Sequence, residues 1–233
     1  MAASASNTTT GQYPIWIDEV EIYCDDTKLK DHLTHDLHYK ENDAARIIQQ
    51  ITGHIKQHSL SDDFWYTAAE NMSSEAIRVL LNSLERNQLV YMISYQDGEG
   101  YTALHCCVDH ENNEVIKMIL DSVSEEECYQ LLSITGPIER TPLQYSCLER
   151  DTESVRVMLN HINQDMRYSL LQMTSADGNT PLHLASYDDH TDVMKLIHES
   201  VTQSQWINLL QMKDEDEMTA LQHAVYLNKR SSI

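Results

Sequence analysis

Histidine is the residue type most able to do chemistry in this chain, because imidazole binds transition metals and transfers protons near neutral pH. Two groups have helical spacing: His32, His35 and His38 follow each other at three residues, and His54 and His58 at four. On a helix such neighbours could present imidazoles to zinc. Steps of three drift around the helix, so His38 would lie well away from His32. We expect solvated or packed histidines here, with no metal site and no cofactor.

A catalytic nucleophile would need a cysteine or serine with a general base and an orienting acid close to it. The chain has five cysteines, of which Cys106 and Cys107 fall inside a repeated pattern that indicates positions on a helix. It has no glycine-rich phosphate loop and no Gly-x-Ser-x-Gly turn. We therefore predict no catalytic residue and no enzyme activity in this chain.

The charge balance argues against two classes of partner. With 16 basic and 37 acidic residues, the formal net charge is −21, which would repel nucleic acid and anionic lipid alike. No apolar stretch approaches the roughly 20 residues of a membrane-spanning helix. Residues 1–12 lack a secretory signal and are expected to be a disordered tail. The odd number of cysteines fits a reducing, cytoplasmic compartment.

A short sequence core recurs at a constant interval of 39 residues. It reads Thr-Pro-Leu-His from Thr180 and returns with small changes at Thr102, Thr141 and Thr219. Threonine suits the N-cap of a helix and proline suits the first helical position. Each core therefore predicts the start of a short helix, which we call the first helix of its unit.

A second helix is predicted in each unit by apolar columns with the same period, three residues apart on one face. These columns are Ile77, Ile116, Val155 and Met194, and Leu80, Ile119, Met158 and Ile197. The stretch 63–69 keeps only the small residues of the core and is interpreted as a degenerate copy. The predicted units are residues 61–99, 100–138, 139–177, 178–216 and a partial unit, 217–233.

The core Thr-Pro-Leu-His-x-Ala, which includes Ala185, is typical of ankyrin repeats, and residues 61–233 resemble that family. The resemblance implies an all-α fold, an ankyrin-type α-solenoid of helix-turn-helix repeats with hairpin fingers. It also implies that His105 and His183 form hydrogen bonds between adjacent repeats. The last copy ends before its second helix could form, so we expect the chain to be part of a longer protein.

Two features depart from the family pattern. Each unit is six residues longer than the roughly 33 of the family, and the excess follows the second helix, where a polar start, an aromatic residue and paired leucines predict an extra helical turn. The glycine that separates the two helices in the family is missing. Its column holds Met72, Glu111, Arg150 and Asp189.

Residues 13–60 are expected to form a helical N-terminal cap, with a decayed repeat as one interpretation. Such a cap would cover the apolar end of a stack. A helix is predicted over residues 43–51. Residues 13–24 alternate apolar and acidic side chains, which fits either a strand or an irregular helix start.

The resemblance implies an intracellular protein–protein interaction module, or scaffold, that binds another protein on a concave face made by fingers and first helices. An acidic chain favours a basic or neutral partner segment. The alternative is a recognition or autoinhibitory appendage of an enzyme encoded downstream of residue 233. By column, the candidate partner-binding residues are Tyr101, Arg140, Tyr145, Asn179, Leu184, Tyr187, Met218 and His223.

Overall fold

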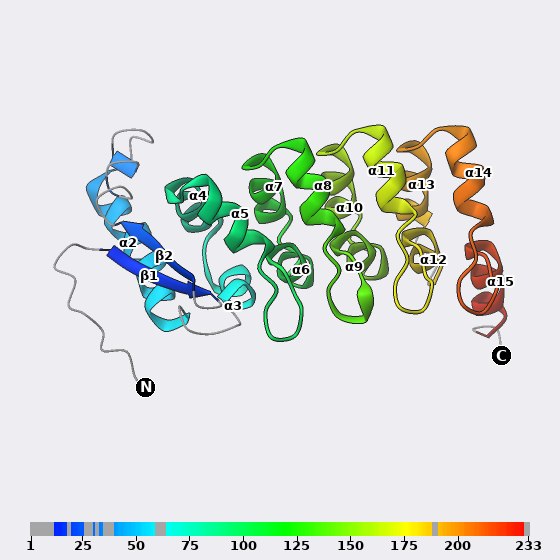
Figure 1. Ribbon diagram of the computed structural model, residues 1–233, viewed down its shortest axis with the longest axis horizontal. Coiled ribbons are helices and arrows are strands. Elements are labelled where there is room, and N and C mark those ends of the chain that lie inside the picture. The colour runs from blue at the N-terminus through cyan, green and yellow to red at the C-terminus, as the bar shows by residue number, and fades with distance from the viewer. Residues whose placement is uncertain are drawn as a thin grey trace. The chain divides into compact units, whose positions relative to one another are not determined.

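The computed structural model describes residues 12–17, 20–25, 30, 33–34, 40–58, 64–187 and 191–230. The chain divides into two compact units, Met1–Met92 and Ile93–Ile233, and each is considered by itself (Figure 1). Nearly all of the tail expected over residues 1–12 lies outside the described residues. The same holds for His32, His35 and His38, the first of the two histidine groups.

The N-terminal unit begins with a β-hairpin. Strands β1 (Gln12–Ile17) and β2 (Val20–Asp25) pair antiparallel, from Gln12 opposite Asp25 to Ile17 opposite Val20. This differs from the wholly helical cap that we expected and decides the choice left open for residues 13–24. β-Branched and aromatic side chains alternating with acidic ones favour an extended strand over a helix.

Helices complete this unit. They are α2 (Glu41–His58), α3 (Phe64–Asn71), α4 (Ser74–Ser83) and α5 (Arg86–Ser94), the last of which extends past its boundary. Helix α2 packs against β1, α3 and α4. Ile51 of α2 and Ile77 of α4 are fully buried, and the Trp65 indole donates to the carbonyl oxygen of Met92 at 2.8 Å. The described residues of the degenerate copy, 64–69, lie in α3.

The C-terminal compact unit, Ile93–Ile233, repeats a set of three helices. First helices are α6 (Ala103–Asp109), α9 (Pro142–Leu148), α12 (Pro181–Ala185) and α15 (Ala220–Arg230). Second helices are α7 (Asn113–Asp121), α10 (Thr152–Asn160) and α13 (Thr191–Glu199), and third helices are α8 (Glu125–Ser133), α11 (Gln164–Leu171) and α14 (Gln203–Gln211). Each kind forms its own row in Figure 1.

These rows confirm the predicted all-α repeat array. Successive first helices pack on one another, as do successive second helices. The sequence predicted one extra helical turn in each unit. The structure has instead a third helix of eight or nine residues. The paired leucines of the third helix pack into the core: Leu131 and Leu132 of α8 are 3% and 0% exposed.

The repeated core begins the first helices as predicted. At Thr141 the hydroxyl accepts from the backbone N–H of Gln144, and the Gln144 side chain accepts from the backbone N–H of Thr141, at 3.2 and 2.8 Å. This reciprocal capping box satisfies two amides that a helix start would otherwise leave free. The same arrangement occurs at Thr102 and Thr180.

Two residues of the column that lacks the glycine keep the backbone conformation of the turn between first and second helices, whereas Met72 of the same column is not in that conformation. Glu111 and Arg150 occupy its column with φ of 51° and 63°, the left-handed conformation that glycine adopts without strain. Asp189 lies outside the described residues. None of the described helices has the length and apolar character that crossing a membrane requires.

Candidate functional site

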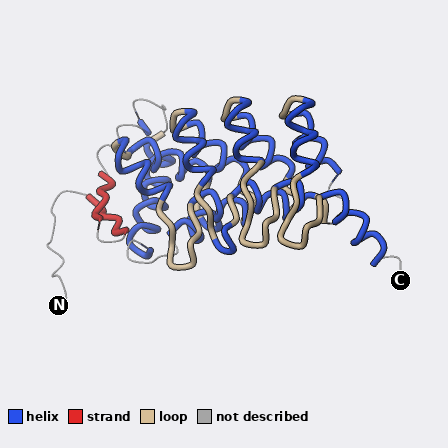
Figure 2. The backbone as a smooth tube through the Cα atoms, turned by 45° about the vertical axis from the view of Figure 1, so that its right-hand side comes forward, coloured by secondary structure: helices blue, strands red, loops and turns tan. Residues whose placement is uncertain are grey.

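The loops before the first helices are four short hairpins, residues 97–101, 136–140, 175–179 and 214–218, which we call the fingers. In each one the first residue donates its backbone N–H to the carbonyl oxygen of the last, at 2.7 to 3.0 Å. Figure 2 shows them as neighbouring tan loops. Side chains reinforce the closure: Asp97 accepts from the backbone N–H of Tyr101 at 2.8 Å, and Asp214 from that of Met218 at 2.9 Å.

Neighbouring fingers also bond to each other. The backbone N–H of Ala176 donates to the carbonyl oxygen of Ile138 at 3.0 Å. Just before the first two fingers, the Gln96 amide donates to the carbonyl oxygen of Thr135 at 2.8 Å. Gly178 has φ +73°, and a Cβ there would lie 2.7 Å from the backbone nitrogen of Glu215. Only glycine fits so close an approach, so the spacing of these fingers is fixed.

The fourth residue of each repeated core ties its first helix to the following finger. His105 bonds through Nε2 to the carbonyl oxygen of Arg140 at 3.0 Å, and His183 to that of Met218 at 3.1 Å. The amide of Gln144 replaces imidazole in the middle unit and donates to the carbonyl oxygen of Asn179 at 2.9 Å. The inter-repeat role implied by the resemblance is thus confirmed for both histidines.

The histidine tautomer follows from these contacts. The backbone N–H of Thr102 donates to Nδ1 of His105 at 3.2 Å, so the ring proton is on Nε2, which donates to Arg140. Burial lowers the pKa of His105 from 6.5 to about 4, although the bond to the Arg140 carbonyl opposes the fall. His105 is therefore neutral at physiological pH and serves as a structural bridge.

Aromatic side chains gather beside the second finger. The ring of Tyr145, on α9, lies 6.0 Å from that of Tyr101 and 5.5 Å from that of His105, centroid to centroid. Its hydroxyl donates to the carbonyl oxygen of Pro137 at 3.2 Å. The Arg140 guanidinium carbon lies 6.0 Å from the centre of the same ring. Desolvation by burial is the main cause that raises the pKa of Tyr145 to about 12.

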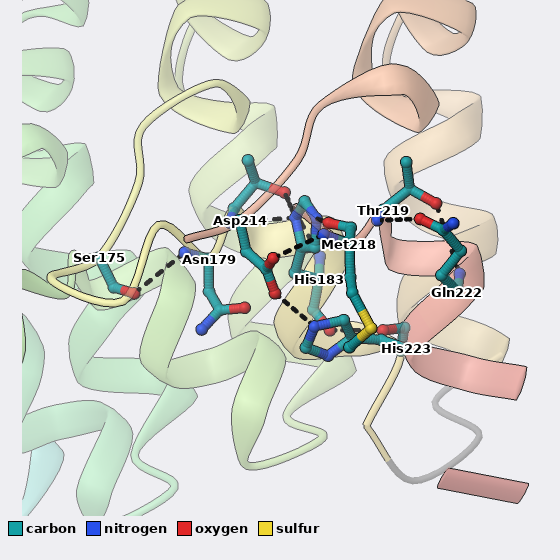
Figure 3. Close-up of polar contacts among 10 residues, drawn as sticks. Ser175, Asn179, His183, Asp214, Met218, Thr219, Gln222 and His223 are labelled. Atoms are coloured by element: carbon teal, nitrogen blue, oxygen red, sulfur yellow. Dashed lines mark hydrogen bonds and ion pairs between the residues drawn. The ribbon is translucent and has the colours of Figure 1, made fainter. Parts of the chain in front are cut away.

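A second cluster surrounds the last finger (Figure 3). Nε2 of His223 forms a very short contact with a carboxylate oxygen of Asp214, and both side chains are buried. The His223 ring lies 5.7 Å from that of His183 and 5.2 Å from that of Tyr187. Asp214 therefore closes its own finger with one oxygen and holds the following helix with the other.

Comparison with protein-family models identifies the repeat. Residues 99–125 match the ankyrin repeat, and residues 123–205 match a model of three ankyrin repeats. Residues 99–205 of the chain are therefore ankyrin repeats. No curated protein matches the chain. Ankyrin repeats generally mediate interactions between proteins and are typically non-enzymatic.

Not all eight candidate binding residues of the ankyrin array reach its surface. Tyr101, Arg140, Tyr145, Tyr187 and Met218 are partly exposed. Asn179, Leu184 and His223 are only 4%, 0% and 6% exposed, so these three cannot offer a surface to a partner, which corrects the expectation.

Packing explains each burial. Leu184 lies on α12, which packs between α9 and α15. Asn179 follows the finger turn, and its carbonyl receives the Gln144 amide. His223 is held by Asp214.

The structure also shows an apolar residue that column reasoning missed. Ile138 lies at the tip of the second finger, 53% exposed, with φ 56°. An apolar, β-branched side chain after Gly136-Pro137 in a turn was the available signal, because turns favour Gly, Pro, Asn, Asp and Ser. Leu221, Val225 and Tyr226 of α15 are exposed by 63%, 50% and 52%.

Groups that could react chemically are enclosed. Cys106, Cys107, Cys128 and Cys147 are buried, and burial is the main cause that raises the pKa of Cys106 to about 12. A thiol with so high a pKa is a poor nucleophile. Among the described residues no three His, Cys, Asp or Glu side chains are placed to hold a metal ion.

Proposed function

We propose that this chain binds a segment of another protein on its finger face, the surface formed by Tyr101, Ile138, Arg140, Tyr145, Tyr187 and Met218. The observation that carries the proposal is the placement of three tyrosines from successive units, Tyr101, Tyr145 and Tyr187, each partly exposed beside the fingers. Tyrosine gives a large rigid contact and keeps a polar tip, which makes it a frequent anchor of binding energy.

The scaffold beneath these side chains is pre-organised. Each finger is closed by a backbone hydrogen bond. His105 of α6 and Gln144 of α9 each bond to the finger that follows in the chain. Because little further ordering is needed when a partner arrives, less of the contact energy is lost as conformational entropy.

The charge of the fingers indicates the kind of partner. They carry the carboxylates of Asp97, Glu99, Glu139, Asp177, Asp214, Glu215, Asp216 and Glu217, against the single guanidinium of Arg140. An approaching basic segment would be attracted and an acidic one repelled. We therefore infer a partner segment that is basic or neutral overall, with an association rate that falls as salt rises.

The test is affinity capture from a cell extract, comparing the chain with its Tyr145→Ala, Tyr187→Ala double variant. The matched control is Tyr129→Ala, Tyr168→Ala, which removes two partly exposed tyrosines from the third helices α8 and α11 instead. A protein retained by the wild type and the control, but not by the finger-face variant, would then be purified and its affinity for all three measured. Truncating two anchors should weaken binding by at least about tenfold.

Equal retention by all three proteins would contradict the finger-face assignment. If the control variant loses more affinity for the partner than the finger-face variant does, the contact lies on the third helices instead. Circular dichroism and urea midpoints of the three proteins separate loss of binding from loss of folding.

A further inference from the structure

Arg140 carries a charge that nothing in the described part of the chain neutralises. Other cations of the array have acidic neighbours: Arg156 pairs with Glu153 and Lys213 with Glu217. Among the residues that the structure describes, Arg140 forms no such ion pair, and its buried Nε has no hydrogen-bond partner there. A guanidinium cannot lose its proton, so a half-buried one without an anion is held at a cost in free energy.

Arg167 of α11 shows how the chain treats a structural arginine. Its Nε donates to the carbonyl oxygens of Leu159 and Ile162, at 2.5 and 2.9 Å. The Arg167 side chain therefore caps the C-terminal end of α10 and finds its hydrogen-bond acceptors within the fold. Arg140 has no equivalent acceptor, which sets it apart from an arginine kept for stability.

The backbone that carries Arg140 is fixed from three directions. Its carbonyl oxygen accepts from the backbone N–H of Gly136 at 2.7 Å and from His105 Nε2 at 3.0 Å. Its own N–H donates to Pro137 at 3.3 Å. The side chain therefore extends from a rigid root, which is what a recognition group needs.

Arg140 also lies among the tyrosines of the finger face. Its guanidinium carbon is 6.0 Å from the Tyr145 ring centre. Burial raises the pKa of both Tyr145 and Tyr187, and the Arg140 charge opposes that rise in both phenols. The one cation of the fingers thus acts on tyrosines of two successive repeats, Tyr145 on α9 and Tyr187 just after α12.

We propose that Arg140 receives the carboxylate of an aspartate or glutamate side chain in the bound protein segment. This inference rests on the proposed function of the finger face. A guanidinium fork matches a planar carboxylate with two parallel hydrogen bonds. A doubly charged phosphate is disfavoured, because finger carboxylates such as Glu139 and Asp177 would repel it more strongly. The partner segment then has one acidic residue among basic or neutral ones.

The experiment is selection of a random peptide library, displayed on phage, against the wild-type chain, Arg140→Gln, and Tyr145→Ala, Tyr187→Ala. Glutamine removes the charge, keeps a polar but shorter side chain, and leaves the backbone carbonyl that holds His105. The wild type should enrich peptides that share an Asp or Glu at one position, and Arg140→Gln should lose that preference.

Synthetic versions of one enriched peptide give the magnitude. Replacing its acidic residue by the matching amide should weaken binding to the wild type by about 10- to 100-fold, and should change binding to Arg140→Gln by less than about threefold. Arg140→Lys, which keeps the charge but not the fork, should fall between the two. A phosphoserine version that binds more tightly would overturn the choice of carboxylate.

The outcomes separate this inference from the function on which it rests. Peptides that need Tyr145 and Tyr187 but share no acidic position would overturn the role of Arg140 and leave the finger face intact. Peptides that bind the tyrosine variant as well as the wild type, or no enrichment over an unrelated acidic protein, would overturn both. Equal urea midpoints for wild type and Arg140→Gln would exclude misfolding as the cause of any loss.

Discussion

Leu221 occupies the same position in its unit as Leu182 does one unit earlier, yet Leu221 is 63% exposed and Leu182 is 1% exposed. Each leucine is the third residue of its repeated core and the second residue of its first helix. The difference lies in what packs against them, since α12 has first helices on both sides, α9 and α15. Identical sequence positions therefore make unequal contributions to stability.

This pair gives a direct test of the stacking. Leu182→Ala should lower the free energy of unfolding by about 2–5 kcal/mol, because it leaves a cavity in a closed core. Leu221→Ala should cost less than about 1 kcal/mol, since that side chain is already in water. Urea denaturation of both variants provides the measurement, and similar losses would contradict the packing described for α15.

The interchange of histidine and glutamine at the fourth core position predicts a second result. His105→Gln should change the free energy of unfolding by less than about 1 kcal/mol, because Gln144 makes the equivalent bonds one unit later. His105→Leu should cost about 2–4 kcal/mol, because it leaves the Thr102 N–H and the Arg140 carbonyl with one bond fewer each. Thermal unfolding of both variants measures the difference. A glutamine variant as unstable as the leucine variant would show that the ring, which packs against Gly136, matters more than its hydrogen bonds.

His105 also predicts a dependence of stability on pH. Its pKa falls from 6.5 to about 4 on folding, so below pH 6.5 the unfolded chain binds a proton that the folded chain does not. The stability it contributes is complete above pH 6.5 and is lost progressively as the pH falls towards 4. The full difference corresponds to about 3 kcal/mol.

Other groups titrate in the same range, so the measurement is a comparison. Urea midpoints from pH 7.5 to pH 4 should fall less steeply for His105→Gln than for the wild type. Burial also lowers the pKa of His183, so part of the slope remains in the variant. Parallel curves would mean that His105 keeps an ordinary pKa in the folded state.

The repeat and its helix starts were predictable because they depend on local chemistry. N-capping by Thr141 depends only on the residues next to it in the chain. The 39-residue period can be seen in the sequence without knowing any contact. Burial of Leu184 and His223 was not predictable in this way. Both lie on first helices where one or two positions separate the exposed side from the packed side, and the neighbouring elements decide which side is packed. His223 in addition meets Asp214, a pairing that no other unit repeats at that column.

The turn between first and second helices supplies the last prediction. Glu111 is exposed and holds φ at 51°, a conformation that costs a side chain with a Cβ about 1–2 kcal/mol. Glycine avoids that cost but loses about 0.5–1 kcal/mol more backbone entropy on folding. Glu111→Gly should therefore stabilise the chain by about 0.5–1 kcal/mol, while Glu111→Ala, which keeps the strain, should change stability by less than about 0.5 kcal/mol. Urea midpoints of the two variants decide the point: a loss of stability in the glycine variant would mean that the glutamate side chain contributes more than its backbone strain costs.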